Sequence, residues 1–452
     1  MKNLNNPLWN CQTSKSIPHL SRRSFLAGAT LGFGALGLSD LLANQQTQGK
    51  AKRVIQIFLQ GGCSHLDTFD YKPELKKRDG DTISGGIAFG TPFDFKPCGK
   101  SGLMLTDAFG PLSKHADDMC VINSQTALTP DHNLSTMEVN TGSFRFTRPS
   151  IGSWVIYGLG AENKNLPSFV SLRSGGGGSP GIYQSAFLPG MFQGVPVNTA
   201  LNKIEDMIAN IKNKSLTPKD QRQQLDLLNK INTINSQVNS KDPSLEARIE
   251  SFELAFKMQT EATDAFDTSK EPESVKTRYG STETGKQMLV ARRLAERGVR
   301  YIQVIHGSYD FHSNVLENFK RRGNELGTGL SALIEDLKQK GMLKETLIVL
   351  CSEFGRTSTR DDVANGNFGR GHWNKGFSTV LIGGGVNGGV NYGKTDELGQ
   401  RVEENEITVP DLHGHILAAL GFNPWNLTFD YNGRPFRLID IHNVQIRKEI
   451  LS

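Results

Sequence analysis

The chain contains the stretch VIQIFLQGGCSHLDTFD at residues 54–70. Its first part, residues 54–59, is a short apolar run that ends at a pair of glycines, a pattern that predicts a buried strand. His65, Asp67 and Asp70 follow at once, and all three are types that bind metal. Carboxylates with imidazole suit Zn²⁺, Mn²⁺ or Fe, whereas carboxylates alone suit Mg²⁺ or Ca²⁺. The stretch therefore predicts a strand that delivers metal ligands at its carboxyl end.

Two later segments repeat this arrangement. The apolar run 299–305 leads to Asp310 and His312, and the run 347–350 leads to Glu353. In an open α/β sheet, ligands bind beyond the carboxyl ends of the strands. We therefore predict that segments nearly 300 residues apart form one shared site at that edge of a sheet.

The order of the predicted elements indicates the class of fold. Apolar runs typical of strands alternate with helical patterns, which predicts βαβ units and a mainly parallel sheet. We expect an α/β fold with a central sheet flanked by helices. The expected strands are residues 54–59, 119–122, 166–172, 299–305, 346–350 and 378–382. The expected helices are residues 131–142, 285–297, 317–338 and 411–420.

Length and composition bound the number of domains and the partners. A chain of 452 residues has room for one large α/β domain with insertions or for two domains. The contents of 37% hydrophobic and 21% charged residues are those of an ordinary globular protein. The formal net charge of +5 is spread along the chain, so no nucleic-acid-binding surface is expected. We assign residues 54–451 to one α/β domain.

Residues 217–268 differ from the rest in being rich in Gln, Lys, Asp and Glu, with no His or Cys. Apolar residues recur there at helical spacing on both sides of Asp242-Pro243, which predicts an inserted helical hairpin. Because apolar stripes of helices ordinarily face a core, we expect these residues to pack rather than to bind a cofactor. They are Leu225, Leu227, Leu228, Ile231 and Ile234 in the first helix, and Leu245, Ile249, Phe252 and Phe256 in the second.

The N-terminus has the features of an export signal. Arg22 and Arg23 precede a glycine- and alanine-rich apolar stretch, residues 27–43, that is too short for a membrane span of about 20 residues. Twin arginines before such a stretch are typical of a bacterial Tat signal. We predict a Tat-type signal over residues 1–43, a linker over 44–53, and a periplasmic or cell-surface location. The signal is either cleaved or kept as an N-terminal anchor, because Leu41 fits the cleavage rule poorly.

The polar segments that follow the first two predicted strands, residues 61–70 and 306–312, contain the main metal-ligand candidates. Asp67 is the expected ligand of the first, while Asp70 either binds metal or caps a helix, and His65 is secondary. Asp310 and His312 have the strongest claim, because alternate residues of an extended segment point to the same side. The competing interpretation of this pair is a polar turn with a solvated histidine, and His306 is a weaker candidate beside it.

The polar segment that follows the third predicted strand, residues 351–356, is considered together with the later segment 369–373. Glu353 is a candidate ligand or general base, and Arg356 could hold an anion with two hydrogen bonds. The competing interpretation is a Glu–Arg ion pair that holds a loop. The segment 369–373 adds Arg370, a second candidate for holding the anion, and His372, a candidate metal ligand or substrate contact in a loop.

His132 is predicted at the start of a helix, where free N–H groups and the helix dipole attract anions. It is a candidate nucleophile, ligand or base, and the competing interpretation is an exposed histidine beside the capping residue Asp131. His413 and His415, on the last predicted helix, are expected to be structural.

These motifs, in this order, resemble domain-of-unknown-function family 1501, a bacterial family of the alkaline phosphatase/sulfatase-like superfamily. The resemblance covers roughly residues 52–451. It implies an alkaline phosphatase-like α/β core with metal sites at the strand ends, and a Tat-like leader is also typical of the family. The matching segments are GGCSHLDTFDYKP (61–73), DHNLSTMEVNTG (131–142), RPSIGSWVIYGLG (148–160), ARRLAERGVRYIQV (291–304), CSEFGRT (351–357), GRGHW (369–373), GGGVNGG (383–389) and NGRPFRLID (432–440).

The resemblance also implies roles for single residues. Asp67 resembles a first-strand metal carboxylate. Asp310 with His312 resembles the superfamily's metal-binding Asp–His pair, and His372 resembles a late metal or substrate histidine. His132 falls near the position where a sulfatase has its nucleophilic cysteine or serine.

The chain also departs from the patterns of its relatives. Phe354 follows Glu353 where relatives have an Asp–His pair, Gly371 replaces an Asp, and Tyr309 replaces a Trp. No C-x-P-x-R stretch is present, so no formylglycine forms at the usual signature, and no Ser or Thr occupies the phosphatase nucleophile position. A standard sulfatase is therefore not expected.

The sequence thus predicts an exported metal-dependent hydrolase that acts on a phosphate or sulfate ester of a small molecule or a polysaccharide. A divalent ion (Zn, Mn, Ca or Mg) would be bound by Asp67, Asp310, His312, Glu353 and His372. The predicted catalytic set is His132, Glu353, Arg356 and Arg370. The alternative is a non-catalytic exported binding or scaffold protein on the same fold, for example for surface polysaccharide.

Overall fold

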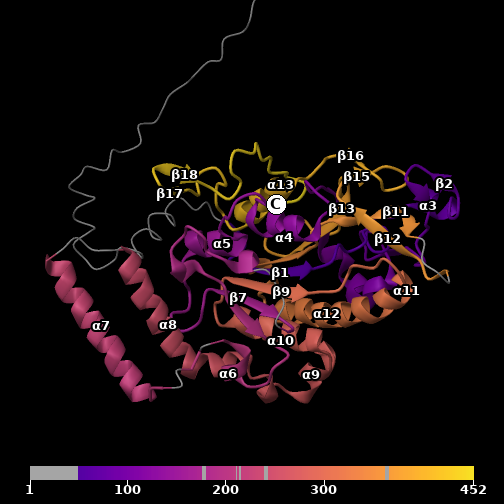
Figure 1. Cartoon of the computed structure of the whole chain (residues 1–452). Coiled ribbons are helices and arrows are strands. Elements are labelled where there is room, and N and C mark those ends of the chain that lie inside the picture. The colour runs from indigo at the N-terminus through magenta and orange to yellow at the C-terminus, as the bar shows by residue number, and fades with distance from the viewer. Residues whose placement is uncertain are drawn as a thin grey trace, which may run out of the picture.

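The computed structural model describes residues 49–175, 180–209, 211–212, 215–238, 243–361 and 366–451. The predicted signal over residues 1–43 lies outside these residues. An 8-stranded sheet forms the centre, in the order β14-β6-β13-β10-β1-β9-β7-β8 (Figure 1). Its strands are β1 (Arg53–Leu59), β6 (Met119–Gln125), β7 (Phe169–Arg173), β8 (Val195–Asn198), β9 (Tyr301–His306), β10 (Thr346–Cys351), β13 (Phe377–Ile382) and β14 (Val390–Tyr392).

The direction of the strands confirms a mainly parallel sheet. Strand β1 pairs in parallel with both β10 and β9, and β9, β7 and β8 continue in the same direction. Strand β13 runs antiparallel to its neighbours β10 and β6, so the sheet is mixed. The segments after β1, β9 and β10 therefore leave the sheet at one edge, which is where the sequence predicts the shared site.

Helices cover both faces of the sheet. Helices α4 (His132–Thr141), α5 (Ile151–Leu159) and α13 (Val409–Ala419) lie on one face, and α10 (Glu283–Glu296) and α12 (Asn324–Gln339) lie on the other (Figure 1). Alternate residues of β1 point to opposite faces of the sheet. Val54 and Phe58 are buried in the hydrophobic core on the side of α4, α5 and α13, whereas Ile55 and Ile57 are buried in the core on the side of α10 and α12. The predicted α/β class, with a central sheet between helices, is confirmed.

The predicted helix over residues 317–338 is interrupted. Helix α11 (Val315–Asn318) is followed by a π-helical turn, Phe319–Gly323, and only then by α12. The remaining helices are α3 (Pro73–Lys77), α6 (Ile204–Met207), α7 (Pro218–Val238), α8 (Pro243–Phe266) and α9 (Glu273–Tyr279). No helix in the described part of the chain has both the length and the apolar character needed to cross a membrane.

Short strands form separate two-stranded ribbons beside the main sheet. Strands β11 (Gly355–Asp361) and β12 (Gly369–Trp373) form an antiparallel ribbon where the sequence predicted a loop. The others are β2 (Thr82–Ile83) with β3 (Gly86–Ile87), β4 (Lys96–Cys98) with β5 (Leu103–Leu105), β15 (Lys394–Thr395) with β16 (Val402–Glu404), and β17 (Phe429–Tyr431) with β18 (Arg434–Phe436).

Helices α7 and α8 form the hairpin predicted from residues 217–268, but its apolar residues do not all pack. Leu225 and Ile249 are buried, whereas Leu227, Leu228, Ile231, Ile234 and Phe252 are exposed. In Figure 1, α8 lies between α7 and the rest of the domain. Only the side of α7 that faces α8 therefore has a packing partner, which differs from our expectation for the whole stripe.

Candidate metal centre

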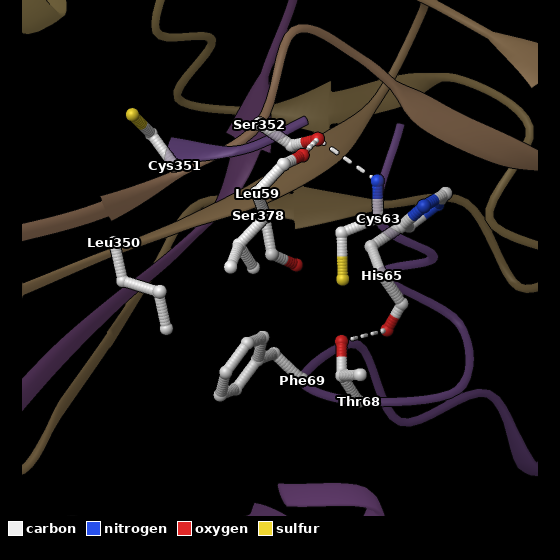
Figure 2. A pocket seen from close by; sticks show the side chains of 9 residues that line it. All are labelled: Leu59, Cys63, His65, Thr68, Phe69, Leu350, Cys351, Ser352 and Ser378. Carbon is white, nitrogen blue, oxygen red and sulfur yellow. Dashed lines mark hydrogen bonds between the residues drawn. The ribbon is translucent and has the colours of Figure 1, made fainter. Parts of the chain in front are cut away.

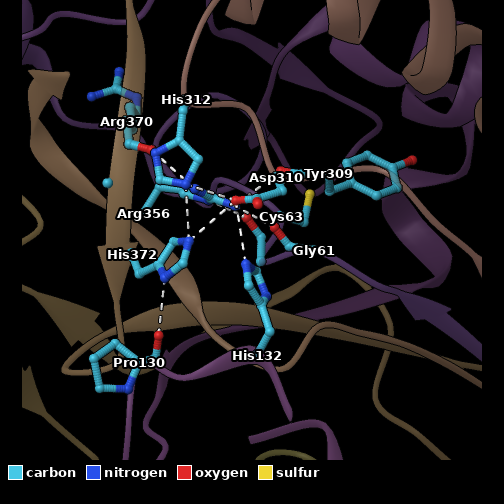
Figure 3. A network of polar contacts seen from close by, with 12 residues as sticks. Gly61, Cys63, Pro130, His132, Tyr309, Asp310, His312, Arg356, Arg370 and His372 are labelled. Carbon is cyan, nitrogen blue, oxygen red and sulfur yellow. Dashed lines mark hydrogen bonds and ion pairs between the residues drawn. The ribbon is translucent and has the colours of Figure 1, made fainter. Parts of the chain in front are cut away.

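Four side chains from three parts of the fold meet at the carboxyl edge of the sheet (Figure 3). His132 is the first residue of α4, whose N-terminus is capped by Asp131 through a hydrogen bond from the Leu134 backbone N–H. Asp310 and His312 follow β9, and His372 lies in β12. The structure thus brings together residues that the sequence placed 240 positions apart (His132 and His372).

The ligand atoms of these residues share a small volume. Asp310 Oδ1 lies 3.3 Å from His132 Nε2, 2.9 Å from His312 Nε2 and 3.1 Å from His372 Nε2. The Nε2 atoms of His312 and His372 are 3.0 Å apart. The ligand atoms of His132, Asp310 and His372 all lie within 4.8 Å of one another. The ligand atoms of His132, Asp310 and His372 therefore converge, and His312 Nε2 adjoins this group beside Asp310 and His372.

Each of the three imidazoles is oriented by a hydrogen bond through its Nδ1 atom, whereas its Nε2 atom lies in the cluster. His132 Nδ1 lies 2.7 Å from Glu353 Oε1, and His312 Nδ1 lies 2.5 Å from Asp361 Oδ2. His372 Nδ1 lies 3.0 Å from the carbonyl oxygen of Pro130. Because these partners only accept, each Nδ1 carries the proton and each Nε2 is turned toward the cluster. Metal-binding histidines are oriented in this way.

Glu353 was predicted as a ligand or base, but the structure places it behind His132 rather than among the converging atoms. It is fully buried, and its Oε1 also accepts a hydrogen bond of 2.8 Å from the Gly61 backbone N–H. Its Oε2 accepts from Ser352 Oγ at 3.2 Å. Glu353 therefore positions His132, and its hydrogen bond raises the pKa of that imidazole.

Arg356 was predicted to hold a substrate anion, but its guanidinium is buried and engaged by the protein. Nη2 lies 2.6 Å from Asp310 Oδ1, Nε donates to the carbonyl oxygen of Gly62 at 2.7 Å, and Nη1 donates to that of Arg370 at 3.0 Å. Burial alone would raise the pKa of Asp310, but the hydrogen bond and charge of Arg356 lower it. Arg356 thus keeps Asp310 ionised and in place.

Asp67 and Arg370 form a buried ion pair away from the cluster. Arg370 Nε lies 2.8 Å from Asp67 Oδ2, and Nη2 lies 3.0 Å from Oδ1. Ser64 Oγ adds a 2.5 Å hydrogen bond to Oδ2, and both charged side chains are 0% exposed. Both carboxylate oxygens of Asp67 thus accept hydrogen bonds within this pair, away from the candidate metal centre. The Arg370 guanidinium is fully engaged by protein groups, so it is not available to bind a substrate anion.

The other early candidates also lie apart from the cluster. Asp70 pairs with Lys72 at 3.0 Å, and the N-cap position of α3 belongs to Lys72, so Asp70 neither joins the cluster nor caps that helix. His65 lines a cavity of ≈ 10 Å³ next to Cys63, too small for a substrate (Figure 2). Burial lowers the pKa of His65 to about 4.

Three further histidines have local partners. Nδ1 of His306 contacts the Tyr309 hydroxyl at 2.9 Å, and the ring is buried. His413 and His415 lie in α13 and contact the carbonyl oxygens of Val139 and Asp411, each at 2.7 Å. All three lie outside the cluster, as we expected for His413 and His415.

Asp361 and the Pro130 carbonyl are the functional groups that sequence reasoning missed. Asp361 lies in a charged stretch that reads as a solvated loop. It reaches His312 because β11 extends the chain back across β12. A backbone carbonyl such as that of Pro130 has no signature in a sequence. Both contacts depend on how the chain folds back on itself.

The donor atoms fit a divalent metal ion. Nε2 of His132 is buried and, although it lies 3.3 Å from Asp310, has no well-formed hydrogen bond. Burial, followed by the charge of Arg356, lowers the pKa of His372, which keeps its Nε2 lone pair available. Three imidazole nitrogens with one carboxylate oxygen are the ligand types that Zn²⁺ and related transition ions prefer.

Fold and site together define an α/β protein with a candidate metal centre at the carboxyl edge of its sheet. The chain belongs to the family described as "Protein of unknown function (DUF1501)", whose model matches residues 51–450. No curated protein matches the sequence significantly.

Several solved structures are similar to the chain at low sequence identity. A sulfatase, PsFucS1 from Pseudoalteromonas sp., is 11% identical with a TM-score of 0.36, over 86% of this chain and 71% of that one. The alkaline phosphatase of the Antarctic bacterium TAB5 is 10% identical with a TM-score of 0.36, over 84% and 100%. The lipoteichoic acid synthase LtaP from Listeria monocytogenes is 11% identical with a TM-score of 0.34, over 86% and 78%. Similarity at this level does not transfer an activity.

Proposed function

We propose that this protein is an exported, metal-dependent hydrolase of phosphate or sulfate esters. The observation that supports it is the convergence of His132, His312 and His372 on Asp310, with each imidazole oriented through its second nitrogen. These four residues are the proposed metal ligands. Asp67 and Glu353 leave the ligand set predicted from sequence, because both serve other partners.

The donor set narrows the choice of ion. Of the four ions predicted, Zn²⁺ and Mn²⁺ accept imidazole nitrogen readily, whereas Ca²⁺ and Mg²⁺ prefer sites built from oxygen. We therefore propose zinc or manganese. Such an ion, when bound, supplies a Lewis acid that polarises an ester oxygen and lowers the pKa of a coordinated water.

The chain's own residues would prepare the site. Glu353 keeps the proton of His132 on Nδ1, so that Nε2 faces the cluster. Arg356 holds Asp310 as a carboxylate. The Phe354 ring packs against His132 and His372, at 4.7 Å and 4.9 Å between ring centroids, and thereby limits ring rotation and shields one side of the site from water.

The charge of the ligand set favours an anionic ester. Three neutral imidazoles and one carboxylate leave a bound divalent ion with a net positive charge. Both predicted anion-holding arginines are engaged by the protein, so this charge would be the main attraction for a phosphate or sulfate group. The metal centre thus replaces Arg356 and Arg370 in the proposed mechanism.

The nucleophile is proposed to be water rather than His132. Nδ1 of His132 is engaged by Glu353, and Nε2 faces the proposed ion, so neither nitrogen is free to attack an ester. In the described chain, the hydrogen bonds of the four cluster residues involve imidazole, carboxylate, guanidinium and carbonyl groups and no serine or threonine hydroxyl. Burial raises the pKa of the neighbouring Cys63 thiol well above its usual value, which disfavours the thiolate.

Export by the Tat pathway and a periplasmic or cell-surface location remain part of the proposal. They rest on Arg22, Arg23 and the apolar stretch after them. A small-molecule ester or a polysaccharide ester at the cell surface is the proposed substrate. A cofactor loaded in the cytoplasm would be compatible with this route, because Tat substrates cross in the folded state.

Metal analysis combined with ester hydrolysis tests the proposal. The purified full-length protein should contain about one zinc or manganese ion per chain and hydrolyse 4-nitrophenyl phosphate, bis(4-nitrophenyl) phosphate or 4-nitrophenyl sulfate. The double change Asp310→Ala with His312→Ala should remove both the ion and the activity. The matched control is His442→Gln, which changes an exposed histidine outside the cluster.

The outcomes separate the hydrolase from the alternative class of protein. Hydrolysis that survives the double change would show that the site is wrong, and a protein that never binds metal would reject the hydrolase. Stoichiometric metal without hydrolysis of any of the three esters would support a non-catalytic binding or scaffold protein. One observation favours that alternative, namely that the protein itself engages both Arg356 and Arg370.

A further inference from the structure

A cleft of ≈ 460 Å³ lies beside the β4–β5 ribbon, apart from the candidate metal centre. It is lined by residues 69–72 and 101–104, and by residues in and around β6, β14 and β15. None of the four proposed metal ligands is among the lining residues. A cleft of this size accommodates a small organic ligand, for example about one or two sugar rings. It is therefore a candidate binding site of its own.

The cleft and the metal centre lie at the same edge of the sheet. Strand β13 is antiparallel to both β10 and β6, so β6 runs parallel to β10, and β14 runs parallel to β6. Asn123 and Asn391, which line the cleft, are close to the carboxyl ends of β6 and β14. Strands β13 and β10 separate β6 from β1, which corresponds to about 14 Å at about 4.8 Å per strand. The cleft is thus a second site, several strands away from the first.

The protein itself compensates the charges at the cleft. Lys72 Nζ lies 3.0 Å from Asp70 Oδ1, and the two side chains are only 8% and 5% exposed. Lys394 is exposed, but its Nζ lies 3.8 Å from carboxylate oxygens of both Glu403 and Glu404. Two lysines therefore face three carboxylates, and no net positive charge remains to attract a phosphate or sulfate group. This balance favours a ligand without charge.

The side chain of Asn391 offers hydrogen-bond donors to such a ligand. Its Oδ1 accepts from Asn123 Nδ2 at 3.0 Å, while Asn123 Oδ1 accepts from Ser378 Oγ at 2.5 Å. These bonds fix the orientation of the Asn391 amide. Within the described residues, its Nδ2 has no hydrogen-bond partner, and the residue is exposed. An amide carries two donors on this atom, so both remain available in the cleft.

Tyr71 adds an aromatic surface to the same cleft. Its side chain is 45% exposed, and its ring packs against that of Phe95 with 5.2 Å between the ring centroids. One part of the ring is thereby supported by the protein, and the rest is free to contact a ligand. A tyrosine ring presents a large, rigid apolar area at little entropic cost. A sugar fits this combination, because its C–H groups pack on a ring while its hydroxyl oxygens accept from an amide.

We propose that this cleft binds a neutral saccharide unit, with Tyr71 as the packing surface and Asn391 as the hydrogen-bond donor. A purely apolar ligand would cover the Asn391 donors without giving them a partner, which is unfavourable. An anionic ligand would meet no uncompensated positive charge. The proposal does not depend on hydrolysis at the metal centre, because it uses none of the residues of that centre.

Isothermal titration calorimetry of the full-length protein with four neutral disaccharides tests the proposal. The probes are cellobiose, lactose, mannobiose and diacetylchitobiose, and at least one should bind with a dissociation constant on the order of 1 mM. Tyr71→Ala should weaken this binding at least about 10-fold through the lost aromatic contact. Asn391→Leu should weaken it about 5-fold through the lost hydrogen bond. Both positions are exposed, so thermal unfolding of the variants reports whether the fold is intact.

Two control proteins separate the cleft from the rest of the molecule. Tyr431→Ala removes a tyrosine that is 42% exposed and outside the cleft, so it should leave the affinity for the disaccharide unchanged. The double change Asp310→Ala with His312→Ala disrupts the proposed metal centre, and it should also leave this affinity unchanged. Saccharide binding and ester hydrolysis are therefore tested independently in the same proteins.

Three results would overturn the proposal. The first is that none of the four disaccharides binds the wild type at concentrations up to about 10 mM. The second is binding that is unchanged in both Tyr71→Ala and Asn391→Leu, which would place the sugar elsewhere. The third is binding that is lost in the Asp310→Ala, His312→Ala protein, which would assign the sugar to the metal centre.

Discussion

Buried carboxylates with similar positions in the sequence have different partners in the fold. Asp67 and Glu353 each follow a strand of the sheet, yet Asp67 pairs with Arg370 and Glu353 with His132. Asp310 differs from both because its side chain is 45% exposed and contacts three imidazoles. The identity of the partner, rather than the type of the residue, separates a proposed ligand from a residue that positions one.

Glu353→Gln should weaken metal binding while the fold is kept. The amide oxygen can still accept from Gly61, but it is a poorer acceptor for the His132 Nδ1 proton than a carboxylate. Loss of such an outer partner typically lowers metal affinity by about 10–100-fold. Competition with a chelating dye measures this affinity, and Asp361→Asn should behave similarly through His312. Unchanged affinity in both variants would contradict the orienting role.

Asp67→Asn should lower stability without removing the metal. The change leaves the buried Arg370 charge without its partner, which costs about 3–5 kcal/mol of unfolding free energy. Urea denaturation measures the loss, and metal analysis of the folded variant should still find the ion. A variant that is stable but free of metal would mean that Asp67 is a ligand after all.

At the scale of secondary structure, the capping residues of α4 determine where the helix begins and ends, and thereby position His132 at the candidate metal centre. Asp131 caps its N-terminus and Gly142 ends it in a left-handed conformation at φ 73°, at the two limits of the helix predicted over residues 131–142. These signals place His132 at the first turn. Glu138, further along α4, is buried and accepts from the Leu128 backbone N–H at 3.0 Å, which holds the preceding loop on the helix.

Glu138 should make stability depend on pH. Burial raises its pKa from 4.5 to about 7, so the folded state binds the proton more tightly than the unfolded state. The stabilisation is complete below pH 4.5 and is lost as pH rises through about 7. Glu138→Gln keeps the acceptor and carries no charge, so it should be more stable than the wild type at pH 8, by about 3 kcal/mol at most, with a much smaller gain at pH 5. Chemical denaturation at the two pH values measures this difference, and an equal effect at both would contradict the assignment.

At the scale of the whole molecule, the candidate metal centre joins α4, the segment after β9, and the β11–β12 ribbon. Its residues meet because β10, β1 and β9 are parallel neighbours whose carboxyl ends lie at one edge. An ion bound there would link three separate parts of the fold. Metal removal is therefore expected to act on global stability as well as on activity.

Chelation of the metal should lower the unfolding temperature of the whole chain. An ion that binds the folded state at 100 times its dissociation constant contributes about 2.7 kcal/mol, which corresponds to roughly 3 °C in a chain of this size. Differential scanning calorimetry with and without a chelator measures the shift. His372→Gln should unfold at the same temperature in both conditions, whereas His442→Gln should keep the wild-type difference.

Local patterns in the sequence are sufficient for the class of fold and for most elements. Apolar runs and caps depend on neighbouring residues, so they predicted β1, β9 and β10, the limits of α4, and the hairpin of α7 and α8. They also predicted that Asp310 and His312 lie together beyond a strand. The π-helical turn before α12 was missed because its residues continue an ordinary helical pattern.

Tertiary structure alone decided which of the candidate residues meet. A carboxylate beyond a strand has the same appearance in sequence whether it faces an arginine, as Asp67 does, or a cluster of imidazoles, as Asp310 does. The burial of Arg356, the reach of Asp361 to His312, and the exposure of the α7 stripe likewise depend on contacts between distant segments. Sequence periodicity reports which side of an element is apolar, whereas only the packed chain determines what that side meets.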